Sequence, residues 1–293
     1  MSNIHSPLRI AAIRFLNPAP LMWDFEHEPR RSLLAHHYSL EWMMPTQCAE
    51  RLSLPSGDPR AADIGLIPVA ALATTPGLVV LPGCAIAATR RVRSILLVRR
   101  ARQPLSQIRT VAADTSSRAS LAYARILFCH WWQPNADGPK FLQHAPDLDP
   151  MLDAADAALL IGDPALYALE ERQNREERSS EELVYHDLAA EWIALTGLPW
   201  VSAVWAIRAS ALDASQRSFE SIASDFIASR DHGLANIETL VVEWSARLPL
   251  AENTIRAYLT ENIHYTLDAP CIDGLRLFYK LAELHGILPK FQL

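Results

Sequence analysis

Three apolar segments of this chain end directly on residues that start helices. Residues 8–15 are followed by Asn17-Pro18, residues 110–113 by the polar stretch 114–120, and residues 153–161 by Gly162-Asp163-Pro164. Asn, Ser, Thr and Asp are favoured helix N-caps, and Pro fits the first helical position. Strands that pass at once into helices are typical of α/β proteins, in which helices cover both faces of mainly parallel sheets. This repeated junction therefore predicts an α/β fold.

The order of the apolar segments predicts two lobes. Further strands are expected at residues 39–43, 62–67, 79–81, 93–98, 140–142 and 200–208. The strand–helix pattern restarts near residue 100 and returns near residue 200, after which helices fill the rest of the chain. We therefore expect a first lobe of residues 1–98 plus 199–293 and an inserted second lobe of residues 99–198. Each lobe is expected to hold a mostly parallel sheet flanked by helices, with a ligand cleft between the lobes.

Charge and motif content argue against several functional classes. The 293 residues carry a formal net charge of −6, whereas a nucleic-acid binder normally carries a basic excess. Neither G-x-G-x-x-G nor the P-loop motif occurs, which disfavours dinucleotide and P-loop sites. The four cysteines form no C-x-x-C pair and the histidines form no H-E-x-x-H motif. No metal and no cofactor is therefore expected.

The hydropathy pattern predicts a cytoplasmic protein. Arg9 and Arg14 interrupt the apolar stretch within residues 1–16, so no secretory signal is expected. No segment approaches the ~18–20 apolar residues that a membrane span requires. No membrane or nucleic-acid partner is expected, and the sequence leaves the oligomeric state open.

The three strand–helix junctions are candidate anion sites. Ligands of open α/β sheets bind at the carboxyl ends of strands, and helix N-termini offer unpaired N–H groups and partial positive charge. Ser117 and Ser120 lie three residues apart on one face of a predicted first helical turn, and Arg118 adds charge there. The simpler alternative is that the Ser/Thr residues, Asn17 and Asp163 only cap their helices. The residue patterns alone thus indicate a two-lobed binder of anions and name no reaction.

Six segments, in matching order and spacing, resemble the menaquinone biosynthesis enzymes of the futalosine pathway. They are residues 13–21 (IRFLNPAPL), 62–69 (ADIGLIPV), 92–98 (VRSILLV), 114–121 (DTSSRASL), 155–166 (ADAALLIGDPAL) and 186–208 (HDLAAEWIALTGLPWVSAVWAIR). The hexamer IGDPAL at residues 161–166, and the stretch from Trp192 through TGLP to Ala203-Val204-Trp205, point to the chorismate dehydratase branch of that family. The resemblance covers most of residues 8–208 and thins in the C-terminal helices.

The resemblance implies a periplasmic-binding-protein-like (type 2) fold and a lyase activity. Members of the branch remove water from chorismate, a small carboxylate, to give 3-[(1-carboxyvinyl)oxy]benzoate without a cofactor. Asn17 is then expected to hydrogen-bond the substrate near the reacting carbons, and Asp163 to orient a neighbour or handle a proton. The residues expected to bind the substrate or shape its site are Arg14, Ser94, Ser117, Arg118, Ser120, Gly162, Thr196 and Pro199.

Two departures from the family pattern and two alternative functions remain. Ala119 stands where the family has Thr, and Arg14 stands where it has a small residue, so Arg14 either adds an anion contact or points out of its strand. The base is either Asp163 or the substrate's own side-chain carboxylate. The alternative functions are the sister enzyme that forms 1,4-dihydroxy-6-naphthoate, which shares a TGLP-like segment, and a solute-binding protein without catalysis.

Overall fold

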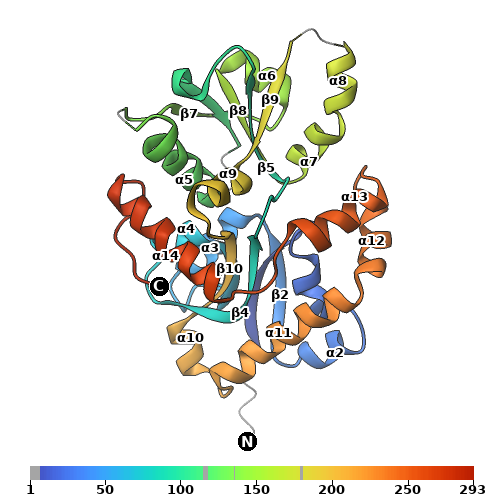
Figure 1. The fold of residues 1–293 in the computed structure, drawn as a ribbon. Helices are drawn as coiled ribbons and strands as arrows, with labels where there is room; N and C mark the ends of the chain where they lie inside the picture. The colour runs from blue at the N-terminus through green and yellow to red at the C-terminus, as the bar shows by residue number, and fades with distance from the viewer. Residues whose placement is uncertain (1–6, 115–117, 135, 179–180) are drawn as a thin grey trace, which may run out of the picture. The chain divides into compact units, whose positions relative to one another are not determined.

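The computed structural model describes residues 7–114, 118–134, 136–178 and 181–293. The chain forms two compact units, one of Met1–Ile86 with Ser202–Asp268 and the other of Ala87–Val201 with Ala269–Leu293. Each unit contains a five-stranded sheet flanked by helices (Figure 1). The α/β class predicted from the strand–helix junctions is confirmed.

The sheet of the first unit has the strand order β2-β1-β3-β10-β4. Its strands are β1 (Leu8–Ile13), β2 (Tyr38–Met43), β3 (Ile64–Pro68), β4 (Leu78–Ala88) and β10 (Trp200–Arg208). Strand β1 runs parallel to both β2 and β3, whereas β10 runs antiparallel to β3. The sheet is therefore mixed, with its parallel strands gathered around β1.

Helices of the first unit bury the apolar faces of this sheet. They are α1 (Trp23–Glu26), α2 (Arg30–Leu34), α3 (Pro45–Ser53), α4 (Val69–Leu72), α10 (Ala209–Ala214), α11 (Phe219–Ala235), α12 (Ile237–Ser245) and α13 (Glu252–Ala257), with short helical turns η1 (Ala19–Met22) and η4 (Tyr258–Asn262). The Phe226 ring of α11 packs on Trp205 of β10 at 4.7 Å and on Phe25 of α1 at 5.1 Å. Aromatic packing thus joins α11 to the sheet and to α1.

The sheet of the second unit has the order β7-β6-β8-β5-β9. Its strands are β5 (Ile95–Arg100), β6 (Thr110–Ala113), β7 (Lys140–Gln143), β8 (Ala157–Ile161) and β9 (Leu183–Asp187), and its helices are η2 (Leu105–Gln107), α5 (Arg118–Leu127), η3 (Phe128–Trp132), α6 (Leu148–Ala154), α7 (Asp163–Glu170), α8 (Arg172–Arg178), α9 (Leu188–Thr196) and α14 (Ala269–Leu284). Strands β7, β6 and β8 are parallel, and β5 runs antiparallel to both β8 and β9. This sheet is mixed as well.

The unit boundaries differ from those expected for the lobes. The segment expected to close the first lobe, residues 199–293, contributes α14 to the second unit, and β5 lies wholly in the second unit rather than ending the first lobe. Two contacts explain the place of α14. A Cβ on Gly274 would stand 2.4 Å from the Pro199 carbonyl oxygen, and the Phe278 ring lies 4.2 Å from that of Tyr123. Because Tyr123 also stacks on Trp200 at 3.7 Å, α14 completes an aromatic core that sequence contiguity does not reveal.

Two strands were misread from the sequence. The segment predicted as residues 79–81 is the 11-residue strand β4, and β9 was not predicted, because it directly follows a run of charged residues. Strand β9 matters because it ends on Asp187, from which α9 begins.

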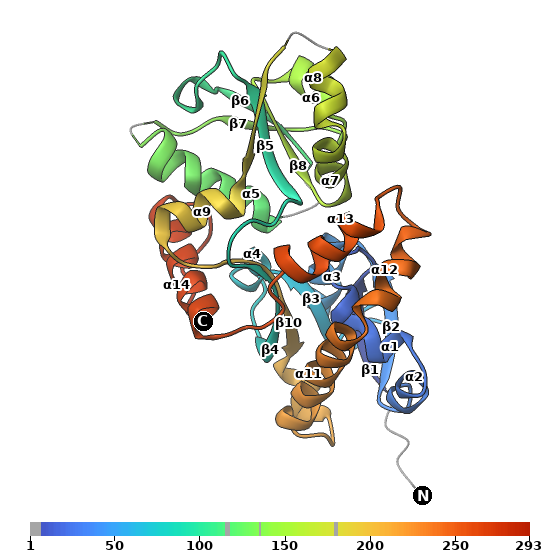
Figure 2. The same cartoon turned by 45° about the vertical axis from the view of Figure 1, so that its right-hand side comes forward.

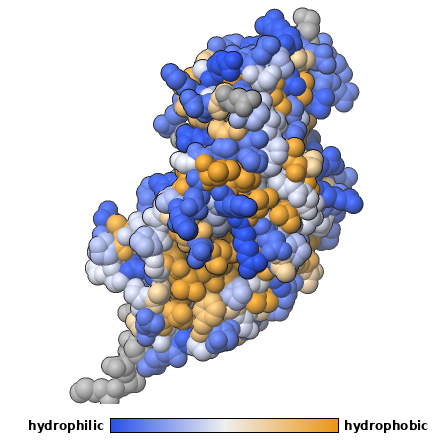
Figure 3. All heavy atoms as spheres, turned by 60° about the vertical axis from the view of Figure 1, so that its left-hand side comes forward, coloured by the Kyte–Doolittle hydropathy of each residue, from blue (hydrophilic) through white to orange (hydrophobic). Residues whose placement is uncertain are grey.

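The described helices include no candidate for a membrane span. Among the described ranges, none of the helices is both long enough and apolar enough to cross a bilayer. On the face drawn in Figure 3, hydrophobic residues gather into areas bordered by hydrophilic ones. Exposed apolar surface of this kind is common in globular proteins and identifies no partner by itself.

Candidate functional site

One edge of the second sheet gathers the starts of three helices. Strands β6 and β8 are parallel, and β9 points the same way because both β8 and β9 pair antiparallel with β5. The carboxyl ends of β6, β8 and β9 therefore meet at one edge together with the amino end of β5, and α5, α7 and α9 begin there (Figure 2). We call this region the carboxyl edge. Helix N-termini in this arrangement direct N–H groups and partial positive charge toward an anion.

Gly162 and Ser94 are joined at the carboxyl edge. The Gly162 N–H donates to the Ser94 carbonyl oxygen at 2.7 Å, and the Gly162 carbonyl accepts from Ala165 at 3.0 Å as α7 begins. Gly162 has φ 72° and ψ −142°, a backbone conformation that residues with a Cβ rarely adopt. Apart from its chain neighbours, none of the residues that the structure describes has an atom within 4 Å of where its Cβ would stand, so the backbone angles and not crowding favour glycine here.

Asp163 presents a carboxyl group suited to proton transfer. It is the first residue of α7 and is partly buried. Burial raises its pKa above the ordinary value for Asp. Within the described part of the chain, no hydrogen bond or ion pair engages its carboxylate. A partly desolvated carboxyl group without a fixed partner can take up or release a proton during a reaction.

Asp187 joins three segments of the carboxyl edge and was missed by sequence reasoning. One carboxylate oxygen caps α9 by accepting from Ala189 at 3.1 Å and Ala190 at 3.0 Å, and it also accepts from Val92 at 3.2 Å. The other oxygen accepts from the Arg93 N–H at 2.6 Å. Burial raises the pKa of Asp187, while these N–H bonds act in the opposite direction. An Asp just before an apolar helix is a sequence signal for an N-cap. The signal could be used only once the strand that ends at Asp187 was recognised, and that strand was not predicted.

The remaining predicted residues of the second unit occupy two places. Arg118 is exposed at the start of α5, and Ser120 is buried in its first turn. Ala119 is fully buried between them, so the position at which the resemblance led us to expect Thr faces the protein interior. Ser117 lies outside the described residues. Thr196 and Pro199 lie at the other end of α9, about 13 Å along the helix from its start.

Thr196 and Pro199 make contacts that end α9. The Thr196 hydroxyl donates to the Trp192 carbonyl at 2.7 Å and accepts from the Leu198 N–H at 3.1 Å. The Trp192 indole N–H donates to the Pro199 carbonyl at 3.2 Å. The structure therefore places these two residues at a helix end that leads into β10, and not beside Gly162 and Asp163.

The two predicted residues of the first unit follow β1. Asn17 is half-buried between β1 and η1, where Pro18 and Pro20 surround the start of the helical turn. Arg14 is exposed, and its guanidinium lies 4.7 Å from the centre of the Trp42 ring on β2. The sequence left open whether Arg14 adds an anion contact or points out of its strand. In the structure its side chain is exposed and stacks on the Trp42 ring at the surface of the first unit.

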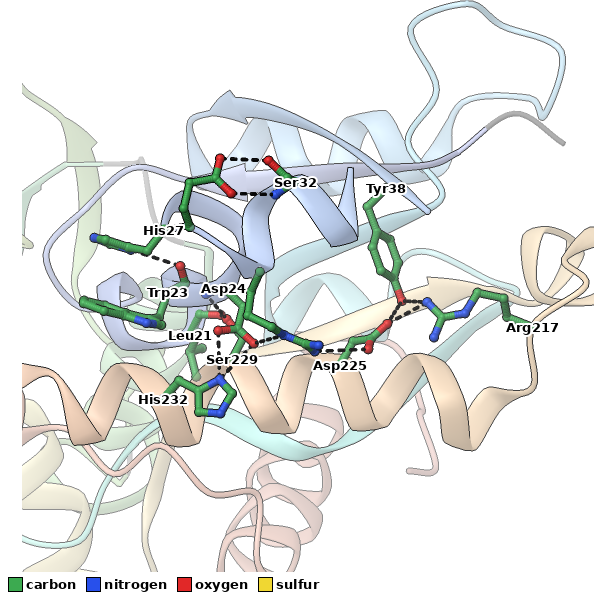
Figure 4. Close-up of polar contacts among 12 residues, drawn as sticks. Leu21, Trp23, Asp24, His27, Ser32, Tyr38, Arg217, Asp225, Ser229 and His232 are labelled. Carbon is green, nitrogen blue, oxygen red and sulfur yellow. Dashed lines mark hydrogen bonds and ion pairs between the residues drawn. The ribbon is translucent and has the colours of Figure 1, made fainter. Parts of the chain in front are cut away.

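A second polar cluster in the first unit is structural. Asp24 is 1% exposed and accepts from His232 Nδ1 at 2.8 Å and from Arg30 Nε at 3.1 Å (Figure 4). The nearby Ser229 hydroxyl accepts from the Asp24 N–H at 2.9 Å and donates to the Leu21 carbonyl at 2.8 Å. Because this hydroxyl is engaged by backbone on both sides, the Asp–His–Ser grouping is not arranged as a nucleophilic triad. It ties α11 to α1 and η1.

A cavity of about 780 Å³ in the first unit lies away from the predicted residues. It is lined at the amino end of β1 by Arg9 and Asp63, whose side chains form an ion pair at 3.0 Å. The opposite, carboxyl end of β1 leads to Asn17. Because its charged groups already pair with each other and ligands of such folds bind at carboxyl ends, we assign this cavity no role in the site.

Comparison with known proteins gives consistent matches. A family model described as menaquinone biosynthesis matches residues 8–284. The chorismate dehydratase of Thermus thermophilus is 28% identical over 214 residues, which cover 71% of this chain and 73% of the relative.

Two solved structures share the fold. Protein AF1704 from Archaeoglobus fulgidus has a TM-score of 0.71 at 14% identity, covering 96% of this chain and 98% of that protein. The periplasmic aliphatic sulphonate binding protein SsuA from Escherichia coli has a TM-score of 0.63 at 15% identity, covering 97% of this chain and 90% of that protein. At these identities the likeness concerns the fold alone, and it confirms the periplasmic-binding-protein-like architecture predicted from the sequence.

Proposed function

The chain belongs to the menaquinone biosynthesis family, and from this premise we propose that it is a chorismate dehydratase. The reaction removes one water from chorismate and gives 3-[(1-carboxyvinyl)oxy]benzoate. The observation that carries the proposal is the carboxyl edge of the second sheet, where α5, α7 and α9 begin and where the glycine and the carboxyl group of the IGDPAL motif start α7. The relationship to the Thermus thermophilus enzyme supports the same activity.

The chemistry requires positioning more than chemical activation. One ring C–H bond and one C–O bond break, the proton and the hydroxyl group leave together as water, and formation of the aromatic ring supplies the driving force. The substrate carries two carboxylates, which helix N-termini hold through N–H groups and partial positive charge. Arg118 and Ser120, at the start of α5, are the side chains proposed to bind one carboxylate.

Asp163 is the proposed proton-handling group of the protein. Its raised pKa makes the neutral carboxyl form more available near neutral pH than for an ordinary Asp, so it can donate a proton to the departing hydroxyl group. The ring proton then goes either to the carboxylate form of Asp163 or to the substrate's own side-chain carboxylate. Asn17, in the first unit, is proposed to hydrogen-bond the substrate near the reacting carbons.

A direct assay tests the proposal. Purified protein is mixed with chorismate and no added cofactor, and the products are followed by liquid chromatography with mass detection. Loss of one water with appearance of the enolpyruvyl benzoate is expected, and it should be absent both without protein and with the Asp163→Ala variant. Unchanged chorismate with the wild-type protein contradicts the proposal.

The sister activity is the second candidate, since both branches share the TGLP segment that begins at Thr196. If chorismate is unchanged, the cyclic intermediate of the naphthoate-forming branch is the next substrate to test. Conversion of that compound alone assigns the sister function. Binding of either compound without turnover favours a solute-binding role.

A further inference from the structure

The segment before β5 adopts a backbone conformation that needs external support. Arg93 has φ 62° and is the one non-glycine residue with positive φ within the described ranges. A residue with a Cβ occupies this left-handed region at an energetic cost, so surrounding contacts must hold it there. The contact that fixes this residue in the structure is made by its backbone N–H.

Asp187 supplies that support. Its Oδ2 accepts the Arg93 N–H at 2.6 Å, a short bond of the kind that a charged acceptor forms. Its Oδ1 accepts from Val92, Ala189 and Ala190 at 3.0–3.2 Å. The two oxygens therefore have different partners among the described residues, since Oδ1 caps α9 and also holds the Val92 N–H, whereas Oδ2 accepts from the Arg93 N–H.

A hydrogen bond to the residue after Arg93 connects this segment to the IGDPAL motif. The next residue, Ser94, directs its carbonyl oxygen to the Gly162 N–H at 2.7 Å, and Gly162 precedes Asp163. A rotation of the backbone at Arg93 would turn this carbonyl and release Gly162. The start of α7, and with it the Asp163 carboxyl group, is thereby linked to Asp187 through two hydrogen bonds, from Arg93 to Asp187 and from Gly162 to Ser94, which the covalent backbone between Arg93 and Ser94 connects.

We infer that Asp187 is a positioning residue for catalysis, acting through Arg93, Ser94 and Gly162 on Asp163. This inference rests on the proposed dehydratase function. The competing explanation is that Asp187 only caps α9. The two explanations differ because capping involves Oδ1, whereas positioning involves Oδ2.

The Asp187→Asn variant separates these roles. Its amide oxygen can keep the place of Oδ1 and the cap of α9, while its NH₂ group faces the Arg93 N–H, donor against donor. We expect kcat for chorismate to fall about 10- to 100-fold with a smaller change in KM, as for a misplaced reacting group. A cap-only role predicts near-normal kcat. Asp187→Ser, which keeps a good cap but does not reach Arg93, serves if the Asn variant is poorly folded.

The Asp156→Ala variant is the matched control. Asp156 lies just before β8, at the opposite end of the same sheet, and its carboxylate likewise accepts backbone N–H groups, from Arg109 at 2.7 Å and Thr110 at 3.0 Å. Its loss should lower the unfolding midpoint and leave kcat and KM within about twofold of wild type, because two sites that are far apart and share no partners act independently.

An Arg93→Gly background provides the rescue test. Glycine adopts φ 62° readily, so Arg93→Gly should make Oδ2 dispensable. In this background, Asp187→Asn should lower kcat by no more than about threefold, which is a non-additive double-mutant cycle. An equal loss in both backgrounds, or wild-type kcat in Asp187→Asn, overturns the inference while the wild-type activity upholds the proposed function. An inactive wild-type protein overturns both.

Discussion

Replacing Gly162 with alanine tests whether the backbone at the carboxyl edge is under constraint. Because φ is 72° and ψ is −142°, an alanine in this place must either accept the strained conformation or rotate the backbone. Beyond its chain neighbours, the added methyl group meets no atom of the described residues within 4 Å, so the expected cost comes from the backbone conformation. We therefore expect Gly162→Ala to lower the free energy of unfolding by about 1–3 kcal/mol, the cost of one residue in a sparsely populated region.

Gly197 provides the matched comparison within the same unit. It too has open space where a Cβ would stand, but its φ of 70° and ψ of 5° fall in the left-handed helical region. Asn tolerates that region and does not tolerate the conformation of Gly162. Gly197→Asn should thus lose much less stability than Gly197→Ala, whereas Gly162→Asn should be as destabilising as Gly162→Ala.

Urea unfolding followed by tryptophan fluorescence measures the four variants, and chorismate turnover is measured in parallel. Rotation at residue 162 breaks the N–H bond to Ser94, so turnover should fall in both Gly162 variants and not in Gly197→Asn. The reasoning is refuted if Asn is tolerated at 162 as well as at 197, or if Gly162→Ala unfolds at the wild-type midpoint.

Three further predictions concern other groups. Asp163→Asn should lower kcat about 100-fold. Because burial raises the pKa of Asp163, ionisation in the folded state costs stability at neutral pH, so the same variant should be more stable than wild type at pH 7. The gain should fade as the pH falls through the raised pKa of Asp163 and be absent below the ordinary Asp pKa of about 3.9; unfolding measured at pH 7 and below that value checks the sign. Ser117→Ala combined with Ser120→Ala should raise KM roughly tenfold with little change in kcat, in steady-state assays. Asp24→Ala should lower the free energy of unfolding by about 1–3 kcal/mol, because the hydrogen bonds from His232 and Arg30 to their buried acceptor are lost while His232 and Arg30 stay accessible to water; a near-neutral effect in a denaturant titration contradicts this.

Local signals in the sequence were enough to locate all three strand–helix junctions, including the strand at residues 110–113 and the start of α5 at Arg118. The stops after β1 and β8 were readable because caps and prolines act over a few residues: Pro18 and Pro20 fit the turn after β1, and Pro164 fits the first turn of α7. The glycine of the IGDPAL motif was marked as a special backbone position for the same reason. These features depend on torsion angles and on hydrogen bonds between near neighbours.

Pairings between distant segments were decided by tertiary structure. The Asp187 carboxylate meets Arg93 across 94 residues of sequence, and no local pattern links the two. Helix α14 joins the second unit because Gly274 and Phe278 fit against Pro199 and Tyr123, far from them in the chain. The raised pKa of Asp163 has the same origin, since burial is a property of the packed unit. Short-range sterics can be read residue by residue, whereas burial and long-range contacts exist only after the chain has packed.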